Sequence, residues 1–168
     1  MKPSSNGGFM YIALILRIMR IVIQRVKCAT VTIDGTLHSE IGAGMMVLVG
    51  VREGDTMADV EWLAAKTAAL RIFDDEAGVM NRSVLDVGGE VLAVSQFTLN
   101  ASTKKGNRPS YIHAAGHDVA VPLYEAYCSE MERLTQRPVK RGVFGANMQV
   151  GLVNDGPVTI IIDSKLRE

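Results

Sequence analysis

The sequence is poor in cysteine and aromatic residues and has no excess charge of either sign. It contains two cysteines, Cys28 and Cys128, which form no C-x-x-C pair. This usage argues against a disulfide framework, fits a reducing, cytoplasmic setting and predicts two inert, buried thiols. Eighteen basic residues are balanced by eighteen acidic ones, which excludes a polycation that binds nucleic acid through its overall charge. Any such contact must come from local patches.

The apolar run near the N-terminus is too short to span a bilayer. It extends from Phe9 to Leu16 before Arg17 interrupts it, so we expect no association with a membrane. Lys2 precedes this run, but no small-residue cleavage site follows it, which argues against an export signal. We predict one domain over residues 19–168, with residues 1–18 as a disordered extension or a misassigned start.

The sequence also lacks the common catalytic signatures. No spacing matches a nucleophile elbow, a metal triad or a Gly-rich phosphate loop. His113 and His117 lie four residues apart, but Gly116 separates them and no third ligand is near, which argues against zinc. We therefore predict no metal and no cofactor, and we expect this pair in a solvated loop or at a helix start.

Apolar patterning predicts both strands and helices. Asp34-Gly35 between two β-branched runs predicts a hairpin, and the continuous apolar run Met45 to Val51 predicts a central strand. Other expected strands are Ile21–Val26, Ala29–Ile33, Leu37–Ile41, Glu90–Leu99, Met148–Val153 and Val158–Asp163, with a loop over 74–86 and a turn over 154–157.

Two segments have helical spacing. One runs from Ala58 to Phe73 after a cap at Asp55 or Thr56, and it carries Trp62 as a core or dimer anchor. The second runs from Asp118, its expected cap, to about Gln136, with Pro122 in the first turn. The fold class is therefore α+β, a mixed or barrel-like sheet with two main helices packed on one face.

Two short motifs have chemical interest: SQFTL (95–99) at a strand end and NDGPVT (154–159) in a tight turn. In a regular strand, Gln96 and Thr98 would share one face, which presents an amide and a hydroxyl where an ester could be held. From the residues alone, an ordinary strand with a cross-strand threonine hydrogen bond is an equally good interpretation.

With KGNRPSY, PLYEAY, FGANMQV and RIVIQRVKCATVTIDG in the same order, these motifs resemble the D-aminoacyl-tRNA deacylase family over about Met19 to Asp163. The resemblance implies a homodimeric, cytoplasmic hydrolase that proofreads chirality by cleaving the ester between a D-amino acid and the 3′ end of tRNA. It implies a pocket for the 3′ aminoacyl-adenosine lined by Ser95, Gln96, Phe97 and Thr98, with Phe144, Met148 and Asn154 close by, although core packing is an equal alternative for Phe144 and Met148.

The same resemblance implies a cis Gly156-Pro157 turn that enters the partner subunit's pocket and faces the substrate's α-carbon. A rigid wall there excludes L side chains. It cannot exclude glycine, so we also predict glycyl-tRNA as a substrate.

No general base is recognisable beside Thr98, so we expect backbone N–H groups around Gln96 to Thr98 to bind the oxyanion, with help from the ribose 2′-hydroxyl. For tRNA phosphates the candidates are Lys104, Lys105 and Arg108, with Arg137, Lys140 and Arg141 further on; solvated loops are an equal alternative. Two other functions stay open: a Thr98-dependent hydrolase of small D-amino acid esters or amides, and a non-catalytic RNA-binding dimer in which Gly156-Pro157 is merely structural.

Overall fold

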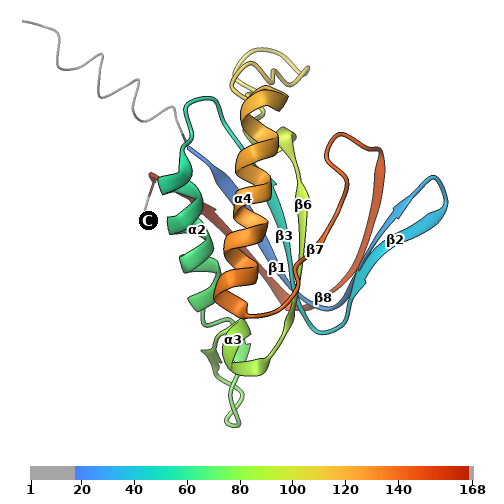
Figure 1. Cartoon of the computed structure of the whole chain (residues 1–168), viewed down its shortest axis with the longest axis vertical. Helices are drawn as coiled ribbons and strands as arrows, with labels where there is room; N and C mark the ends of the chain where they lie inside the picture. The colour runs from blue at the N-terminus through green and yellow to red at the C-terminus, as the bar shows by residue number, and fades with distance from the viewer. Residues whose placement is uncertain (1–17, 167–168) are drawn as a thin grey trace, which may run out of the picture.

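A long, curved first strand organises the structure, a computed structural model that describes residues 18–166 (Figure 1). The predicted extension over 1–18 lies outside the described residues except for Ile18, which is buried. The elements in chain order are β1 (Arg20–Ile33), β2 (Thr36–Ile41), β3 (Gly44–Gly50), α2 (Met57–Ala69), β4 (Phe73–Asp74), β5 (Met80–Arg82), α3 (Val84–Val87), β6 (Glu90–Ser95), the 3₁₀ turn η1 (Phe97–Asn100), α4 (His117–Thr135), β7 (Lys140–Arg141) and β8 (Met148–Asp163).

The main sheet is mixed and nearly closed. Its strand order is β2-β1-β3-β6-β7, with β8 paired along the other edge of β1. β3–β6 and β6–β7 are parallel, and the other pairings in this sheet are antiparallel. The Ser39 hydroxyl donates to the Arg141 carbonyl over 2.9 Å and so links β2 to β7. The predicted α+β, barrel-like class is confirmed.

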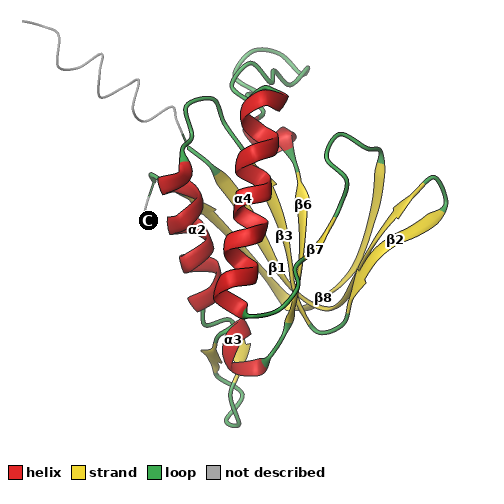
Figure 2. Ribbon diagram, viewed as in Figure 1, coloured by secondary structure: helices red, strands yellow, loops and turns green. Residues whose placement is uncertain are grey.

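The two long helices lie side by side over one face of the sheet (Figure 2). Buried tyrosines tie α4 to both neighbours. The Tyr124 hydroxyl donates to the Ala93 carbonyl of β6 in the sheet (2.9 Å), and the Tyr127 hydroxyl donates to Thr67 Oγ1 of the adjacent helix α2 (3.0 Å). Trp62 packs, half-buried, against this core. The prediction of two helices on one face is therefore confirmed.

The helix ends differ in part from the prediction. Thr56, one of two expected caps, forms a capping box with Asp59 at the start of α2. The expected cap at Asp118 is wrong, because the cap of α4 is Gly116. Pro122 is therefore the sixth helical residue rather than a first-turn residue, and it removes the hydrogen bond that the Asp118 carbonyl would accept.

The structure also corrects other local predictions. The strand expected over Glu90–Leu99 ends at Ser95, and the 74–86 loop contains the β4–β5 hairpin and α3, which a Ser83–Asp86 capping box starts. The turn expected at 154–157 is present, but as a bulge within one continuous β8 rather than a break between two strands, because both of its flanks pair with β1 across register shifts. The second of those shifts turns both Lys27 and Cys28 outward, so Cys28 is exposed rather than buried; Cys128 is buried.

Candidate active site

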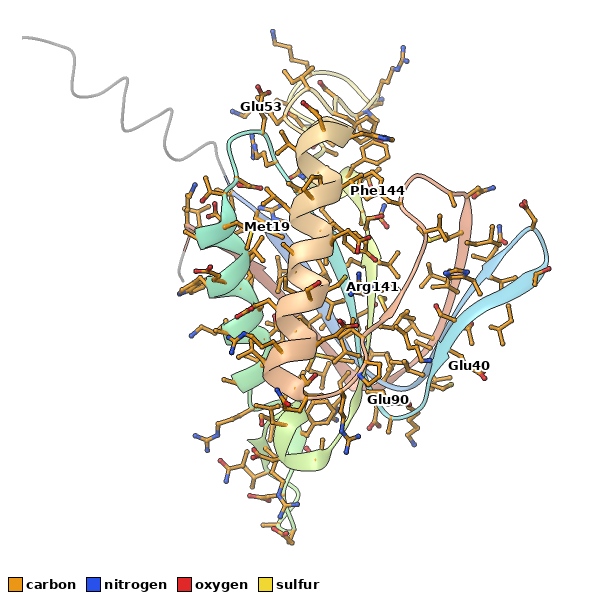
Figure 3. The ribbon with its side chains drawn as sticks, in the orientation of Figure 1. Met19, Glu40, Glu53, Glu90, Arg141 and Phe144 are labelled. Carbon is orange, nitrogen blue, oxygen red and sulfur yellow. The ribbon has the colours of Figure 1, made fainter. Side chains whose placement is uncertain are left out.

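A cavity of about 530 Å³ opens where β6 ends. Its walls come from three segments far apart in the sequence: Val94 to Phe97, Ala114 to His117, and Phe144 to Val150. Figure 3 shows Phe144 beside α4 on the side of the 143–148 loop. The fold thus brings the SQFTL motif together with Phe144 and Met148, two of the three residues that were expected near it.

Close packing against β3 sets the shape of the SQFTL segment. Gln96 N–H donates to the Val49 carbonyl over 2.8 Å, and Leu99 N–H donates to the Gln96 carbonyl over 3.3 Å. Gly50 lies directly beneath this turn, where an added Cβ would lie 2.9 Å from Leu99 Cβ and 3.1 Å from the Gln96 carbonyl oxygen. The glycine therefore lets η1 approach the strand.

Gln96 and Thr98 lie together because the chain turns after Ser95, not because they alternate along a strand as predicted. Gln96 Nε2 donates to Thr98 Oγ1 across the turn. Ser95, Gln96 and Phe97 line the cavity, whereas Thr98 does not. The side chain bonded to the Thr98 hydroxyl is an amide, which cannot act as a general base, and this arrangement disfavours Thr98 as a nucleophile.

The backbone of this turn has unengaged hydrogen-bond donors. The N–H groups of Phe97 and Thr98 begin η1, so they have no acceptor within it, and no other acceptor bonds them among residues 18–166. Phe97 is 54% exposed, and its ring meets Tyr111 edge-to-face at 5.1 Å between centroids. Phe97 therefore contributes an exposed apolar ring to the cavity lining, and the two N–H donors at the start of η1 are unengaged.

The opposite wall contains residues that sequence reasoning missed. His117 lines the cavity, and its ring meets Phe144 edge-to-face at 5.1 Å. Gly145 has a φ of +79°, which lets the chain fold back between Phe144 and Met148. The helix-start position of His117 was predicted, but its place in the cavity had no local signal because it depends on the loop before β8.

Gly156 and Pro157 lie away from this cavity in their own chain. Their peptide bond is cis, and both residues are exposed. They lie opposite Arg25 of β1. Along the strand direction, Arg25 is four residues from the level of Ser95, and across the sheet β8 is the third strand from β6. These offsets correspond to about 13 Å and about 14 Å at ordinary strand spacings.

A buried cation and an amide brace this turn. Arg25 is 8% exposed and donates to the carbonyl of Asp155 (2.7 Å) and to that of Ile72 (2.7 Å). Asn154, expected near the substrate, does not line the cavity of its own chain; its amide accepts from Val158 N–H (2.8 Å) and donates to the Val158 carbonyl (3.1 Å). The turn is therefore held from both sides.

The predicted phosphate-binding residues separate into two groups. Lys104, Lys105 and Arg108 are exposed on the loop between η1 and α4. In the second group, Arg141 pairs with Glu125 and Glu132, and Arg137 donates to the Gly88 carbonyl. Lys140, the third residue of this group, is exposed. Because the two arginines already have partners, the first group is the better candidate. Within residues 18–166, no helix is long and apolar enough to cross a membrane, and no three acidic, histidine or cysteine side chains gather as metal ligands would.

Comparison with known proteins agrees with this architecture. The model of the family described as "D-Tyr-tRNA(Tyr) deacylase" matches residues 22–163. A D-aminoacyl-tRNA deacylase of Parabacteroides distasonis is 61% identical over 150 residues, which cover 89% of this chain and 100% of that protein. One of Dechloromonas aromatica is 55% identical over the same coverage.

Solved structures share the fold. One described as "c-Myc DNA Unwinding Element Binding Protein" is 40% identical, with a TM-score of 0.81 over 86% of this chain and 97% of that chain. A probable eukaryotic D-amino acid tRNA deacylase, 17% identical, has a TM-score of 0.75 over 87% of this chain and 99% of that one.

The chain belongs to the D-Tyr-tRNA(Tyr) deacylase family. It is accordingly a hydrolase of the D-aminoacyl-tRNA deacylase type, as the sequence motifs predicted.

Proposed function

We propose that this enzyme, as a cytoplasmic homodimer, discharges D-aminoacyl-tRNA and glycyl-tRNA during translation and excludes L-aminoacyl-tRNA with a wall supplied by the partner subunit. The observation that carries the proposal is the separation within one chain: Ser95 to Phe97 line the cavity, while the exposed Gly156-Pro157 turn lies well outside it. The turn of a second copy is the one that can reach this cavity.

Ester cleavage at this site depends on backbone donors and the substrate's own hydroxyl. The N–H groups of Phe97 and Thr98 bind the oxyanion of the tetrahedral intermediate. Gln96 positions the terminal adenosine, and Thr98 fixes Gln96 through the bond across the turn. The ribose 2′-hydroxyl assists the attacking water, which replaces a protein base.

A rigid Gly156-Pro157 turn would select substrates by excluding the L side chain. Gly156 has a φ of +147°, and an added Cβ would lie 2.7 Å from Val158 Cγ2. A turn held this firmly excludes any side chain directed at it but accepts a hydrogen atom. D-amino acids and glycine present hydrogen in that direction, whereas L-amino acids present a side chain.

The last strand supports assembly with a second copy. β8 pairs with β1 alone among the described strands, so its other edge is open. Val153 is 51% exposed and Ile161 65% exposed on this strand, on either side of the turn. Open edges with apolar side chains are unfavourable in a monomer and favour a partner.

The decisive assay measures release of amino acid from D-tyrosyl-, L-tyrosyl- and glycyl-tRNA. We expect D-tyrosyl- and glycyl-tRNA to be discharged, and L-tyrosyl-tRNA to react on the order of 100-fold more slowly or worse. Pro157→Ala should narrow the D-to-L ratio while the circular dichroism spectrum stays unchanged. Equal rates of wild-type protein on D-tyrosyl- and L-tyrosyl-tRNA would rule out steric exclusion by the Gly156-Pro157 turn. Binding of tRNA without turnover would identify a non-catalytic RNA-binding dimer.

A further inference from the structure

A second, smaller cavity of about 320 Å³ lies on the other side of η1. Its lining combines cationic side chains with hydroxyl groups and the backbone of the η1 turn; the cationic or titratable residues are Arg20, Arg52, Lys104 and His113, and the hydroxyl residues are Ser102 and Thr103. Such a lining is suited to an anion with several acceptor oxygens.

The fold holds the two sides of this cavity together. Buried Asn100 donates through Nδ2 to the Val51 carbonyl over 3.0 Å, which ties the end of η1 to the chain just before Arg52. Glu53 N–H donates to the His113 carbonyl over 3.1 Å, so Arg52 and His113 stay close. Figure 3 places Glu53 at the end of the molecule where α4 begins.

The positive charge of the cavity is only partly compensated. Arg20 makes a two-pronged pair with Asp163 through contacts of 2.6 and 2.9 Å. The half-buried Arg52 guanidinium forms no hydrogen bond or ion pair with any residue in 18–166, and Lys104 is exposed. Burial, together with the charge of Arg20, lowers the pKa of Arg52 despite the opposing effect of Asp55 and Asp163. A bound anion would relieve this cost.

The cavity adjoins the candidate active site. His113 lines the small cavity and its neighbour Ala114 lines the large one. Likewise, Leu99 lines the small cavity and Phe97 lines the large one. An RNA strand whose last nucleotide occupies the large cavity can therefore place its preceding phosphate at the small one.

We propose that the cavity of Arg52, Lys104 and His113 binds a backbone phosphate of the RNA strand just 5′ of the terminal adenosine. The inference rests on the proposed function, because it takes the 3′ aminoacyl-adenosine to occupy the larger cavity. Arg52 donates in a fork to the phosphate oxygens, Lys104 adds charge, and Ser102 and Thr103 donate hydroxyl hydrogens. Phosphate contacts of this kind contribute affinity and register rather than base specificity.

The test compares a substrate with phosphates and one without. Turnover of D-tyrosyl-tRNA and of 3′-D-tyrosyl-adenosine is measured for wild-type protein, Arg52→Gln, Arg52→Lys and the control Arg133→Gln. Arg133 is exposed on α4, 16 residues and about 24 Å along the helix from His117. Inorganic phosphate serves as a competitor in each assay.

We expect Arg52→Gln to raise the KM for D-tyrosyl-tRNA by about tenfold and to leave kcat unchanged. Its KM for D-tyrosyl-adenosine should match that of wild-type protein, and the slope of log KM against log salt should fall by about 0.7. Arg52→Lys should recover part of the affinity, and Arg133→Gln should behave as wild type. Inorganic phosphate should raise the KM of wild-type protein for D-tyrosyl-tRNA but not its KM for D-tyrosyl-adenosine.

Three results would overturn the assignment: an equal loss on both substrates, no loss on either, or a phosphate effect on D-tyrosyl-adenosine that depends on Arg52, which would indicate a free anion as the ligand. Failure of the wild-type protein to discharge D-tyrosyl-tRNA would instead contradict the proposed function, so the two failures are distinguishable.

Discussion

Asp55 is a buried carboxylate next to a second one. It is 6% exposed, its Oδ2 accepts from Arg52 N–H over 2.6 Å, and its Oδ1 has no hydrogen-bond partner among the described residues. Burial raises the pKa of Asp55 to about 6, opposed by the hydrogen bond from Arg52 N–H and reinforced by the charge of Asp59. The folded protein therefore holds this proton more tightly than the unfolded chain.

This pKa predicts a fall in stability as pH rises. Between about pH 4, where an unfolded aspartate ionises, and about pH 6, the native state binds more protons than the unfolded state. The free energy of unfolding should decrease by about 2–3 kcal/mol across this window, at 1.36 kcal/mol per pKa unit. Urea unfolding at a series of pH values measures it.

Asp55→Asn is the matched variant, because asparagine keeps an acceptor for Arg52 N–H and cannot ionise. It should flatten the difference between pH 4 and pH 6. A variant with the same pH profile as wild-type protein would show that Asp55 does not titrate in this range.

Among the elements, η1 depends for its position on one distant residue, Gly50. Gly50→Ala would place a methyl group 2.9 Å from Leu99 Cβ and 3.1 Å from the Gln96 carbonyl oxygen, so η1 has to move outward. We expect a loss of about 1–3 kcal/mol in unfolding free energy, typical of overpacking. We also expect kcat for D-tyrosyl-tRNA to fall by more than tenfold, because the N–H donors of Phe97 and Thr98 shift.

Gly42→Ala is the control for this substitution. Its methyl group would meet only one atom, the Glu90 carboxylate oxygen that accepts from Gly42 N–H, at 3.2 Å, and Gly42 does not line the cavity. It should keep wild-type kcat. If Gly50→Ala also keeps wild-type kcat, the close approach of β3 is not what positions η1.

The elements with local signals were the ones predicted from sequence. Asp34 and Gly35 both have positive φ, as the hairpin signal required, and the apolar run predicted over Met45 to Val51 contains most of the central strand β3 (Gly44–Gly50). The SQFTL segment alternates like a strand, yet it turns after Ser95 because Gly50, 45 residues earlier, leaves room for it. Contacts between distant residues leave no periodic trace, so the turn and the position of His117 could not be predicted.

At the scale of the whole molecule, assembly should determine activity. Val153→Glu places a charge on the open edge of β8, close to the Gly156-Pro157 turn, and should weaken association. Analytical ultracentrifugation should show monomers, and deacylation at equal chain concentration should fall at least about tenfold, as expected when a buried interface charge costs over 1.4 kcal/mol.

Val79→Glu is the comparison variant, since Val79 is 58% exposed on the β4–β5 hairpin. It should remain dimeric and active. A monomeric Val153→Glu protein that still discriminated D-tyrosyl- from L-tyrosyl-tRNA would remove the need for a partner.

The wide spacing between cavity and turn in each chain has a genetic consequence. Each cavity of the proposed dimer combines Gln96 of one copy with Pro157 of the other. A substitution at Gln96 and a substitution at Pro157 therefore damage different halves of a site. When the two are co-expressed, the mixed dimer regains one complete site out of two. Alleles of this gene would then complement each other, although each of them alone is defective.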